Sequence, residues 1–493
     1  MNRFLLKNTI PSIMMVTVVG FTLINSVHAQ ENTSAFTHNE YEEKELKKTN
    51  KTKIHDKWKK SLTPSEIASL EVFKSADINW LIRRADGNID FIEKKIDVDV
   101  NNKRIQLDAN DIRKTIRTLD TALMKSKQIE KDIHVYKYLT VLDLGFRMDI
   151  LNAAHGMTKI ERDKFGFISK NLKYGISGVY LDAYLKKKEA LNKGQILLDL
   201  KLPKGAHFGY LDNDNHILLP RDQGIIITNA SIIVEKGTEI IKLDAELVDK
   251  NIVKNRIKTK ENSINEKFRD AIDTSTSIHR ENEIPIETKL VNIVTHSLSA
   301  SFTVNRAESL LHVLTQNIPN DLLIKTLEQM RHNAPITITD SKFVNVEKEL
   351  GLKASNLDSL AIAYYDEETK QLVLNLNKYE PQINPFKEIM DGSEAVHTDS
   401  HILLHEFGHA VDELILNNLS NTNEFKKLYE EEKNNIKIEE YMKSHPKEFF
   451  ASAFAYLFSP NTQYQMRIKQ EAPKTVSFIQ NALEKKGFFK KNN

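Results

Sequence analysis

The sequence contains no cysteine among its 493 residues. This absence excludes a disulfide framework, a thiolate nucleophile and any metal site with cysteine ligands. An excess of one charge is also missing, because 70 lysines and arginines stand against 68 aspartates and glutamates. Since nucleic-acid binders gain much of their affinity by neutralising phosphates, this balance argues against a nucleic-acid partner. Any metal site in this chain has to be built from histidine and carboxylate side chains.

A long apolar run is lacking as well. The longest, Ile10–Ile24, has about 15 residues, whereas a membrane-spanning helix needs ~20. It follows Arg3 and Lys7 and precedes the small-residue pattern Ser26–Ala29. This arrangement is typical of a secretory signal peptide, which we place at residues 1–29, with a membrane anchor as the weaker alternative. The sequence therefore predicts a secreted, extracellular protein without a transmembrane segment.

Changes in composition divide the rest of the chain. Residues 30–57 are charge-dense and predict a disordered lead-in, and Asp273–Ser277 has no large apolar residue and marks a boundary. We expect a first folded domain at 58–250, a helical connector at 251–283 and a second folded domain at 284–493.

The two folded domains differ in hydrophobic period. From Thr63 to Lys193 the apolar spacing is mainly helical, and from 195 to 249 β-branched runs alternate with tight turns. Helices followed by an antiparallel sheet predict an α+β first domain.

The second domain is expected to be mainly helical with a small sheet. The helices begin with Ala307–Leu314 and Asp321–Met330, and a hairpin follows from Leu360–Tyr365 and Leu372–Leu376. We expect Leu372–Leu376 to be an edge strand on which an extended peptide pairs, with simple sheet structure as the alternative.

The segment His405–His409 reads His-Glu-Phe-Gly-His. Two histidines four residues apart lie on one face of a helix and can reach one metal ion, while Glu406 can accept a proton from the attacking water. An apolar stripe supports the helix; its members are Leu403, Leu404, Phe407, Val411 and Leu414. His401, one turn upstream, is expected to support the site or face solvent rather than bind the metal.

A catalytic zinc needs a third protein ligand and one open position. The downstream carboxylates that could supply it are Glu413, Glu424, Glu430–Glu432, Glu439, Glu440 and Glu448. Spacing alone does not choose among them. Glu448 follows Pro446 at the start of an amphipathic helix, where the helix dipole favours a glutamate even without a metal.

Three stretches and one tyrosine resemble the protease domain of the anthrax lethal factor and Pro-Pro endopeptidase family: Leu404–Asp412, Glu448–Phe454 and Ala472–Ile479, with Tyr441. The resemblance covers about residues 285–488 and implies a zincin-type metalloprotease fold.

For the site, the same resemblance implies that His405, His409 and Glu448 bind zinc and that Tyr441 stabilises the oxyanion. Ser452 departs from the family, which usually carries a second glutamate at that position.

The segment Trp58–Glu66 resembles the entry helix of ADP-ribosylating toxins, a fold that lethal factor carries in its central region. That family has an arginine, a Ser-Thr-Ser strand and a Glu-x-Glu or Gln-x-Glu pair where this chain has Lys137, Ser169–Asn171 and Asp214–His216. Lysine lacks the bidentate fork of arginine, and no carboxylate stands at the final position. The first domain is therefore predicted to be a degenerate ADP-ribosyltransferase-like fold kept for binding or positioning.

Together these features predict a secreted zinc metalloendopeptidase, a toxin or virulence factor, with Glu406 as general base. Its substrates are expected to be proteins or peptides, host proteins among them, and no docking domain for a translocating partner is recognisable. Two alternatives stay open: an ADP-ribosyltransferase toxin and a non-catalytic secreted binding protein.

Overall fold

The structure of the chain is a computed structural model. It describes residues 51–93, 95–100, 103–144, 159–190, 195–211, 215–273, 289–330, 333–350, 362–376 and 399–488. The chain divides into two compact units, Met1–Lys60 and Ser61–Asn493. The predicted signal peptide lies outside the described residues, as does the lead-in up to residue 50, and residues 51–57 belong to helix α2 (Lys51–Ser61).

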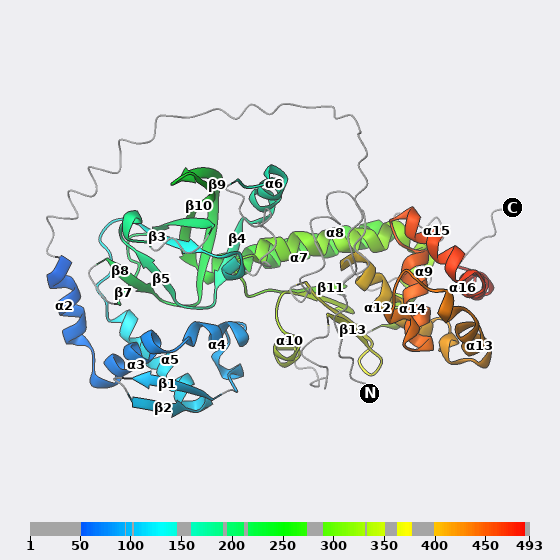
Figure 1. Cartoon of the computed structure of the whole chain (residues 1–493), viewed down its shortest axis with the longest axis horizontal. Helices are drawn as coiled ribbons and strands as arrows, with labels where there is room; N and C mark the ends of the chain where they lie inside the picture. Colours follow the sequence, from blue (N-terminus) through cyan, green and yellow to red (C-terminus); the bar gives the residue numbers. More distant parts are fainter. Residues whose placement is uncertain are drawn as a thin grey trace. The chain divides into compact units, whose positions relative to one another are not determined.

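An eight-stranded mixed sheet dominates the first part of the second unit, in the order β4-β9-β10-β6-β3-β5-β8-β7. Its members are β3 (Ile133–Leu139), β4 (Tyr174–Ser177), β5 (Leu181–Tyr184), β6 (Ile196–Leu202), β7 (Gly209–Tyr210), β8 (His216–Leu219), β9 (Gln223–Glu235) and β10 (Thr238–Asp249). The two longest strands, β9 and β10, form a hairpin whose turn residues, Lys236 and Gly237, both have positive φ (Figure 1). This agrees with the tight turns that the sequence predicts between the β-branched runs of residues 195–249.

Helices and a small hairpin accompany this sheet. They are α3 (Pro64–Ser75), α4 (Ile78–Arg84), η1 (Ile89–Phe91), β1 (Ile96–Val100), β2 (Lys103–Leu107), α5 (Ala109–Met124), η2 (Val141–Leu144), α6 (Arg162–Asn171) and η4 (Lys187–Glu189). The combination of helices and strands confirms the predicted α+β class.

One detail of the predicted first domain was incomplete, and another was wrong. Strands β1 to β5 lie in the stretch from Thr63 to Lys193 that the apolar spacing assigned mainly to helices. A short buried apolar run is compatible with either a helix or a strand, and here pairing within the sheet determines that these runs are strands. The sheet is also not wholly antiparallel, because β10 pairs with β6 in parallel, with Ile241 opposite Ile196.

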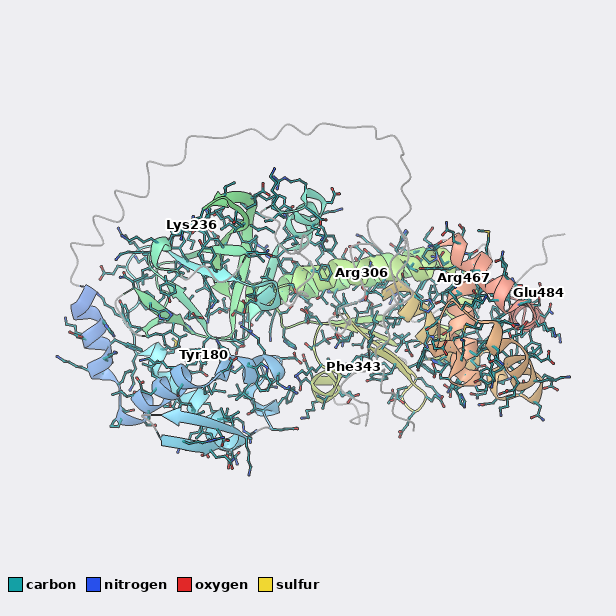
Figure 2. All side chains as sticks on the ribbon, in the orientation of Figure 1. Tyr180, Lys236, Arg306, Phe343, Arg467 and Glu484 are labelled. Atoms are coloured by element: carbon teal, nitrogen blue, oxygen red, sulfur yellow. The ribbon has the colours of Figure 1, made fainter. Side chains whose placement is uncertain are left out.

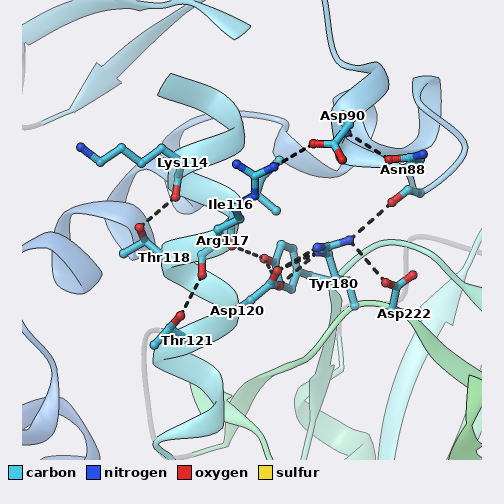
Figure 3. A network of polar contacts seen from close by, with 12 residues as sticks. Asn88, Asp90, Lys114, Ile116, Arg117, Thr118, Asp120, Thr121, Tyr180 and Asp222 are labelled. Atoms are coloured by element: carbon cyan, nitrogen blue, oxygen red, sulfur yellow. Dashed lines mark hydrogen bonds and ion pairs between the residues drawn. The ribbon is translucent and has the colours of Figure 1, made fainter. Parts of the chain in front are cut away.

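A buried polar network attaches α5 to this sheet (Figure 3). The hydroxyl of Tyr180, which is only 1% exposed, lies 2.6 Å from Oδ1 of Asp120 on α5. Arg221 donates to the same carboxylate through Nε at 3.1 Å and Nη2 at 2.8 Å. Because Tyr180 precedes β5 and Arg221 precedes β9, the network fixes α5 against the sheet.

The predicted connector is the long helix α7 (Lys250–Asp273), which follows β10 directly (Figure 1). Beyond it lies a second sheet in the order β11-β12-β14-β13, formed by β11 (Val291–Val294), β12 (Ile336–Thr339), β13 (Ala363–Asp366) and β14 (Gln371–Asn375). The predicted hairpin is confirmed, but β13, and not β14, lies at an edge of the sheet. Strand β14, which the sequence suggested as the edge, is paired on both sides, with β12 and β13.

Helices make up most of the remaining described residues, as predicted. They are α8 (Ala300–Asn317), α9 (Asn320–Gln329), α10 (Phe343–Leu350), α12 (Asp399–Leu414), η5 (Leu419–Asn421), α13 (Asn423–Glu432), η6 (Lys433–Asn435), η7 (Tyr441–Lys443), α14 (Pro446–Leu457), α15 (Thr462–Glu471) and α16 (Pro473–Lys485). No helix among the described residues combines the length and apolar character needed to cross a membrane.

The two sheets are joined by close backbone contact as well as by α7. A Cβ built on Gly175 of β4 would lie 2.0 Å from the carbonyl oxygen of Leu298, so only glycine fits there. Beside it, Ser301 of α8 donates to the carbonyl of Asn171 at 2.7 Å. The same hydroxyl accepts from the amide of Lys173 at 2.8 Å. These contacts hold β4 directly against the start of α8.

Candidate metal centre

Helix α12 carries the two histidines of the His-Glu-Phe-Gly-His segment. The Nε2 atoms of His405 and His409 lie 3.2 Å apart, and the two residues are 7% and 9% exposed. The start of the helix is fixed by Arg306 of α8, labelled in Figure 2, whose Nε donates to Oδ2 of Asp399 at 2.7 Å. One turn of a helix thus aims two imidazoles at the same point.

Helix α14 brings a carboxylate to that point. Pro446 occupies its first turn and the ring of His445 accepts from the amide of Lys447, so the helix begins just before Glu448. Oε2 of Glu448 lies 3.0 Å from Nε2 of His405 and 3.4 Å from Nε2 of His409. These three residues are the group among the described residues whose ligand atoms could hold a metal ion together.

The close packing of α12 on α14 depends on Gly408. A Cβ at this position would lie 3.2 Å from both the Cα and the carbonyl oxygen of Ala451. Such a contact is tighter than packing normally allows, so the absence of a side chain lets the helices approach. The glycine in the motif therefore helps to place Glu448 beside the histidines.

The donor set fits zinc. Four ligands at about 2.0–2.1 Å in a tetrahedron lie about 3.3–3.4 Å from one another. The three distances here, 3.0, 3.2 and 3.4 Å, are close to that value. Two imidazole nitrogens at 3.2 Å need a shared cation or a proton between them, and two histidines with one carboxylate are a known ligand set of catalytic zinc.

Local electrostatics also favour a cation. Burial lowers the pKa of His405, but its hydrogen bond to Glu448 and the negative charges of Glu406 and Glu448 outweigh this and raise it to about 9. Burial raises the pKa of Glu448, yet hydrogen bonds to the two histidines bring it well below its ordinary value. The cluster thus stabilises positive charge, as protons or as a metal ion.

Ser452 orients the first histidine. Its Oγ lies 3.1 Å from Nδ1 of His405, on the opposite side of the ring from Glu448. A hydroxyl that accepts from Nδ1–H leaves Nε2 unprotonated and free to bind a metal. Ser452 thus keeps an acceptor where the resemblance led us to expect a glutamate.

Glu406 is half-buried beside the cluster. Burial raises the pKa of its carboxyl group, while the positive charges of the nearby His405 and His409 act in the opposite direction. A carboxylate in such surroundings is suited to accept a proton.

Tyr441 lies beside the His-His-Glu cluster, in the short helix η7. Its ring centroid is 6.0 Å from that of His405, and the residue is 46% exposed. Desolvation raises the pKa of its hydroxyl, and the charges of Glu448 and Glu406 raise it further, so it stays protonated at neutral pH. A protonated phenol with one side open to solvent is able to donate to a bound ligand.

The other carboxylates that spacing left open have different partners. Glu439 lies 3.5 Å from Nε2 of His401, and both are buried. Glu413 contacts Tyr365 and Lys370, and Glu432 accepts from the backbone amide and hydroxyl of Thr475. The contact between His401 and Glu439 gave no signal in the sequence because it joins residues on separate elements.

In the first part of the unit, two of the positions that the resemblance matches to transferase catalytic residues contact the same aspartate. Lys137 of β3 forms an ion pair with Asp182, and Nε2 of His216 lies 3.6 Å from Oδ2 of that aspartate. The His216 ring stacks on Tyr184 with centroids 4.5 Å apart. Burial raises the pKa of Asp182, but these two partners reverse the effect and hold it below its usual range.

The structure also corrects the secondary structure expected at Ser169–Asn171, where the transferase family has a serine strand. Ser169–Asn171 ends helix α6, and the strand β4 begins only at Tyr174. Asn171 contacts α8 through Asn305 at 3.2 Å, so local helix formation and packing against α8 override the strand. Asp214 lies outside the described residues.

Comparison with known proteins gives one family match for each of the two parts of the chain. Residues 277–482 match the family described as "Anthrax toxin lethal factor, N- and C-terminal domain", and residues 47–251 match the family "ADP-ribosyltransferase exoenzyme". Lethal factor of Bacillus anthracis is 26% identical over 422 residues, which are 83% of this chain and 48% of that protein.

Two further relatives each match one part. A Pro-Pro endopeptidase of Clostridioides difficile is 35% identical over 85 residues, 17% of this chain and 38% of that protein. C3larvin toxin, an ADP-ribosyltransferase from Paenibacillus larvae, is 27% identical and covers 39% of this chain and 99% of its own, with a TM-score of 0.32. The chain spans about half the length of the lethal factor that it matches.

Proposed function

Since the chain resembles lethal factor in both of its parts, we propose that it is a secreted zinc-dependent metalloendopeptidase. The observation that carries the proposal is the convergence of His405, His409 and Glu448 within 3.0–3.4 Å of one another, beside the half-buried Glu406. The arrangement provides three ligands and a base, which is what zinc-dependent hydrolysis of a peptide bond requires.

In this proposal His405, His409 and Glu448 hold zinc. Zinc in such a site acidifies water and polarises a carbonyl group. Glu406 accepts the proton of the attacking water and passes it to the leaving amine. Tyr441 donates a hydrogen bond to the oxyanion as charge develops there.

The substrate is proposed to be an extended segment of a protein. Within the described residues β13 ends its sheet, and it borders α12. Main-chain pairing on such an edge would lay a peptide across the cluster. Host proteins are the candidate substrates for a secreted toxin or virulence factor.

The proposal is tested by incubating the purified chain with host lysate and with cell-surface fractions, then identifying new protein N-termini by mass spectrometry. We expect cleavage that a chelator abolishes and zinc restores, and that Glu406→Gln lacks. Cleavage that survives both the chelator and Glu406→Gln would contradict the proposal.

ADP-ribosylation is the second candidate, and the family match over residues 47–251 favours it. The pairing of Lys137 with Asp182 and the presence of His216 in place of a carboxylate speak against it. With labelled NAD and host lysate we expect no transfer above background. Label transfer that His216→Ala abolishes would make the first domain an active transferase.

A further inference from the structure

Tyr441, which donates to the oxyanion in the proposed reaction, is not held in place by its own burial. The residue is 46% exposed and begins η7, a helix of three residues whose N-cap residue, Glu440, makes no side-chain capping bond. A single 3₁₀ turn has little stability of its own, so contacts on either side must fix it. The position of the Tyr441 hydroxyl therefore depends on how the chain around η7 is attached.

Helices α13 and α15 hold the two ends of this segment. Oε2 of Glu471, at the end of α15, accepts from the backbone amides of Lys437 at 2.7 Å and Ile438 at 2.9 Å. On the other side, the hydroxyl of Tyr429 on α13 donates to the carbonyl of Lys443 at 2.6 Å. Neither helix carries a residue of the His-His-Glu cluster. These contacts therefore fix the ends of the segment without aligning it on α12.

Glu439, two residues before Tyr441, connects the segment to α12. Its Oε2 lies 3.5 Å from Nε2 of His401, and the two residues are 5% and 8% exposed. His401 is one turn before His405 on the same helix. Its ring also packs on Tyr456 of α14, with centroids 4.4 Å apart. The contact between His401 and Glu439 thus joins the Tyr441 segment to α12 at a point that α14 supports as well.

The burial of this contact makes it costly to break. A buried carboxylate is unfavourable unless a polar or charged partner offsets its desolvation, and a buried imidazole nitrogen has the same requirement. Moving the segment away from α12 would separate two such groups at once. The segment also reaches the cluster, since the ring centroids of Tyr441 and His405 are 6.0 Å apart. A short covalent link therefore transmits the position of Glu439 to the tyrosine ring beside the histidine.

We propose that Glu439, through its contact with His401, fixes the Tyr441 segment on α12 and is a positioning residue for the Tyr441 hydroxyl. The inference rests on the proposed function, in which that hydroxyl donates to the oxyanion. An oxyanion donor has to lie within about 2.7–3.1 Å of the developing charge, and a displacement of about 1 Å can cost up to about 100-fold in rate. Loss of the contact should therefore reduce turnover while the metal ligands stay in place.

Two variants remove the contact, one from each side. Glu439→Leu and His401→Leu each replace one partner by an apolar side chain that cannot make it. We expect kcat to fall about 10-fold to 100-fold, with KM within about twofold and zinc content unchanged. Glu432→Leu is the matched control, because Glu432 is also a buried glutamate but accepts from the backbone amides of Lys474 and Thr475 on α16. The control should keep the parent kcat.

A double-mutant cycle separates positioning from general stability. In the Tyr441→Phe background the hydroxyl is absent, so adding Glu439→Leu should change kcat by less than about twofold. A purely structural role would reduce kcat by the same factor in both backgrounds, and that result would overturn the inference. So would a parent-like kcat in both Glu439→Leu and His401→Leu.

Hydrogen exchange measures the attachment without zinc or substrate. The amides of Lys443 and Ser444 donate to the carbonyls of Glu440 and Tyr441 at 3.1 and 3.0 Å, so their exchange reports the opening of η7. In the metal-free protein we expect both variants to speed this exchange about 10-fold, while α15 exchanges as in the parent. Parent-like exchange of η7 in both variants would show that the contact does not hold the segment.

The outcomes distinguish this inference from the proposed function. If the parent binds zinc and cleaves substrate while both variants match it, only the positioning role fails. If the parent neither binds zinc nor cleaves any substrate, the proposed function fails and the positioning role falls with it. Unfolding midpoints measured for every variant identify a folding defect. Glu439→Gln, the smaller change, replaces Glu439→Leu if that variant unfolds, and its kcat should fall in the same direction.

Discussion

Ser452 is the residue that selects which nitrogen of His405 faces Glu448. Its hydroxyl is a neutral acceptor, whereas a carboxylate at the same place would make the imidazole more basic. A weaker acceptor still fixes the tautomer and the ring plane. We therefore expect the site to bind zinc with Ser452 in place.

Ser452→Ala tests this role. Without the acceptor the ring of His405 is free to rotate or to carry its proton on Nε2, so zinc affinity should fall about 10-fold to 100-fold. Competition with a chromogenic chelator measures the change. Ser459→Ala is the control, since the hydroxyl of Ser459, beyond the end of α14, accepts from the backbone amide of Asn461 at 3.1 Å. Equal zinc affinity in Ser452→Ala and the parent would show that Ser452 does not orient His405 for zinc binding.

The choice between two buried glutamates gives a second residue-scale prediction. Glu448→Gln should lower zinc content of the purified protein sharply, because a carboxylate ligand becomes a neutral amide. Glu439→Gln should retain zinc, because Glu439 faces His401 instead. Metal analysis of both purified variants decides which of the two glutamates is the third ligand. Loss of zinc only in Glu439→Gln would mean that the third ligand is assigned to the wrong helix.

Much of the candidate site could be predicted from residues close together in the sequence. The spacing of His405 and His409 gives a shared helical face without any tertiary information. Glu448 could be chosen over other carboxylates only by resemblance, because its approach depends on how α14 packs on α12. The contact between Tyr365 and Glu413 could not be predicted for the same reason, since it joins a strand to a helix 48 residues away.

At the scale of elements, the site exists because α12 and α14 lie unusually close. Gly408 faces the backbone of Ala451, and backbone has little freedom to move aside. Any side chain at 408 should push the helices apart and carry Glu448 away from the histidines.

Gly408→Ala should therefore destabilise the protein by about 1–3 kcal/mol and weaken zinc binding at the same time. Gly166→Ala is the matched control, because it is also helical but has nothing within 4 Å of an added Cβ. That control should be neutral or stabilising by up to about 1 kcal/mol. Urea unfolding with zinc titration checks both. Unchanged stability and zinc affinity in Gly408→Ala would show that the approach of the helices is not limiting.

The elements themselves were predictable to different degrees. Long periodic segments such as α7 and α8, and the hairpin of β9 and β10, follow from local patterns. The parallel pairing of β10 with β6 does not, because it is decided by partners more than forty residues apart. For the same reason local alternation cannot tell that β13, and not β14, lies at the edge of its sheet.

At the scale of the whole second unit, the two parts are held together by buried polar contacts. Oδ2 of Asp86 accepts from the amide of Lys342 at 2.9 Å and from Nδ2 of Asn345 at 2.6 Å. Burial raises the pKa of Asp86 to about 6, although these two hydrogen bonds act against it. An unfolded aspartate has a pKa of about 3.9, so the folded protein binds the proton more tightly.

This shift predicts a pH dependence of stability. Asp86 contributes fully to the free energy of unfolding below about pH 4, and the contribution is lost as the pH rises through about 6. Asp86→Asn cannot ionise and tolerates the positive φ of this position, so relative to the parent it should gain about 1–2 kcal/mol between pH 5 and 7.5. Urea unfolding at both pH values measures this. Asp90→Asn, at an exposed carboxylate, is the control, and an equal response of both variants would refute the assignment.

The most direct test of the central claim is anomalous diffraction at the zinc edge from crystals of the full chain. The account predicts one strong peak about 2.0–2.2 Å from Nε2 of His405, Nε2 of His409 and a carboxylate oxygen of Glu448. A peak between His401 and Glu439, or no peak from crystals grown with zinc, would contradict it.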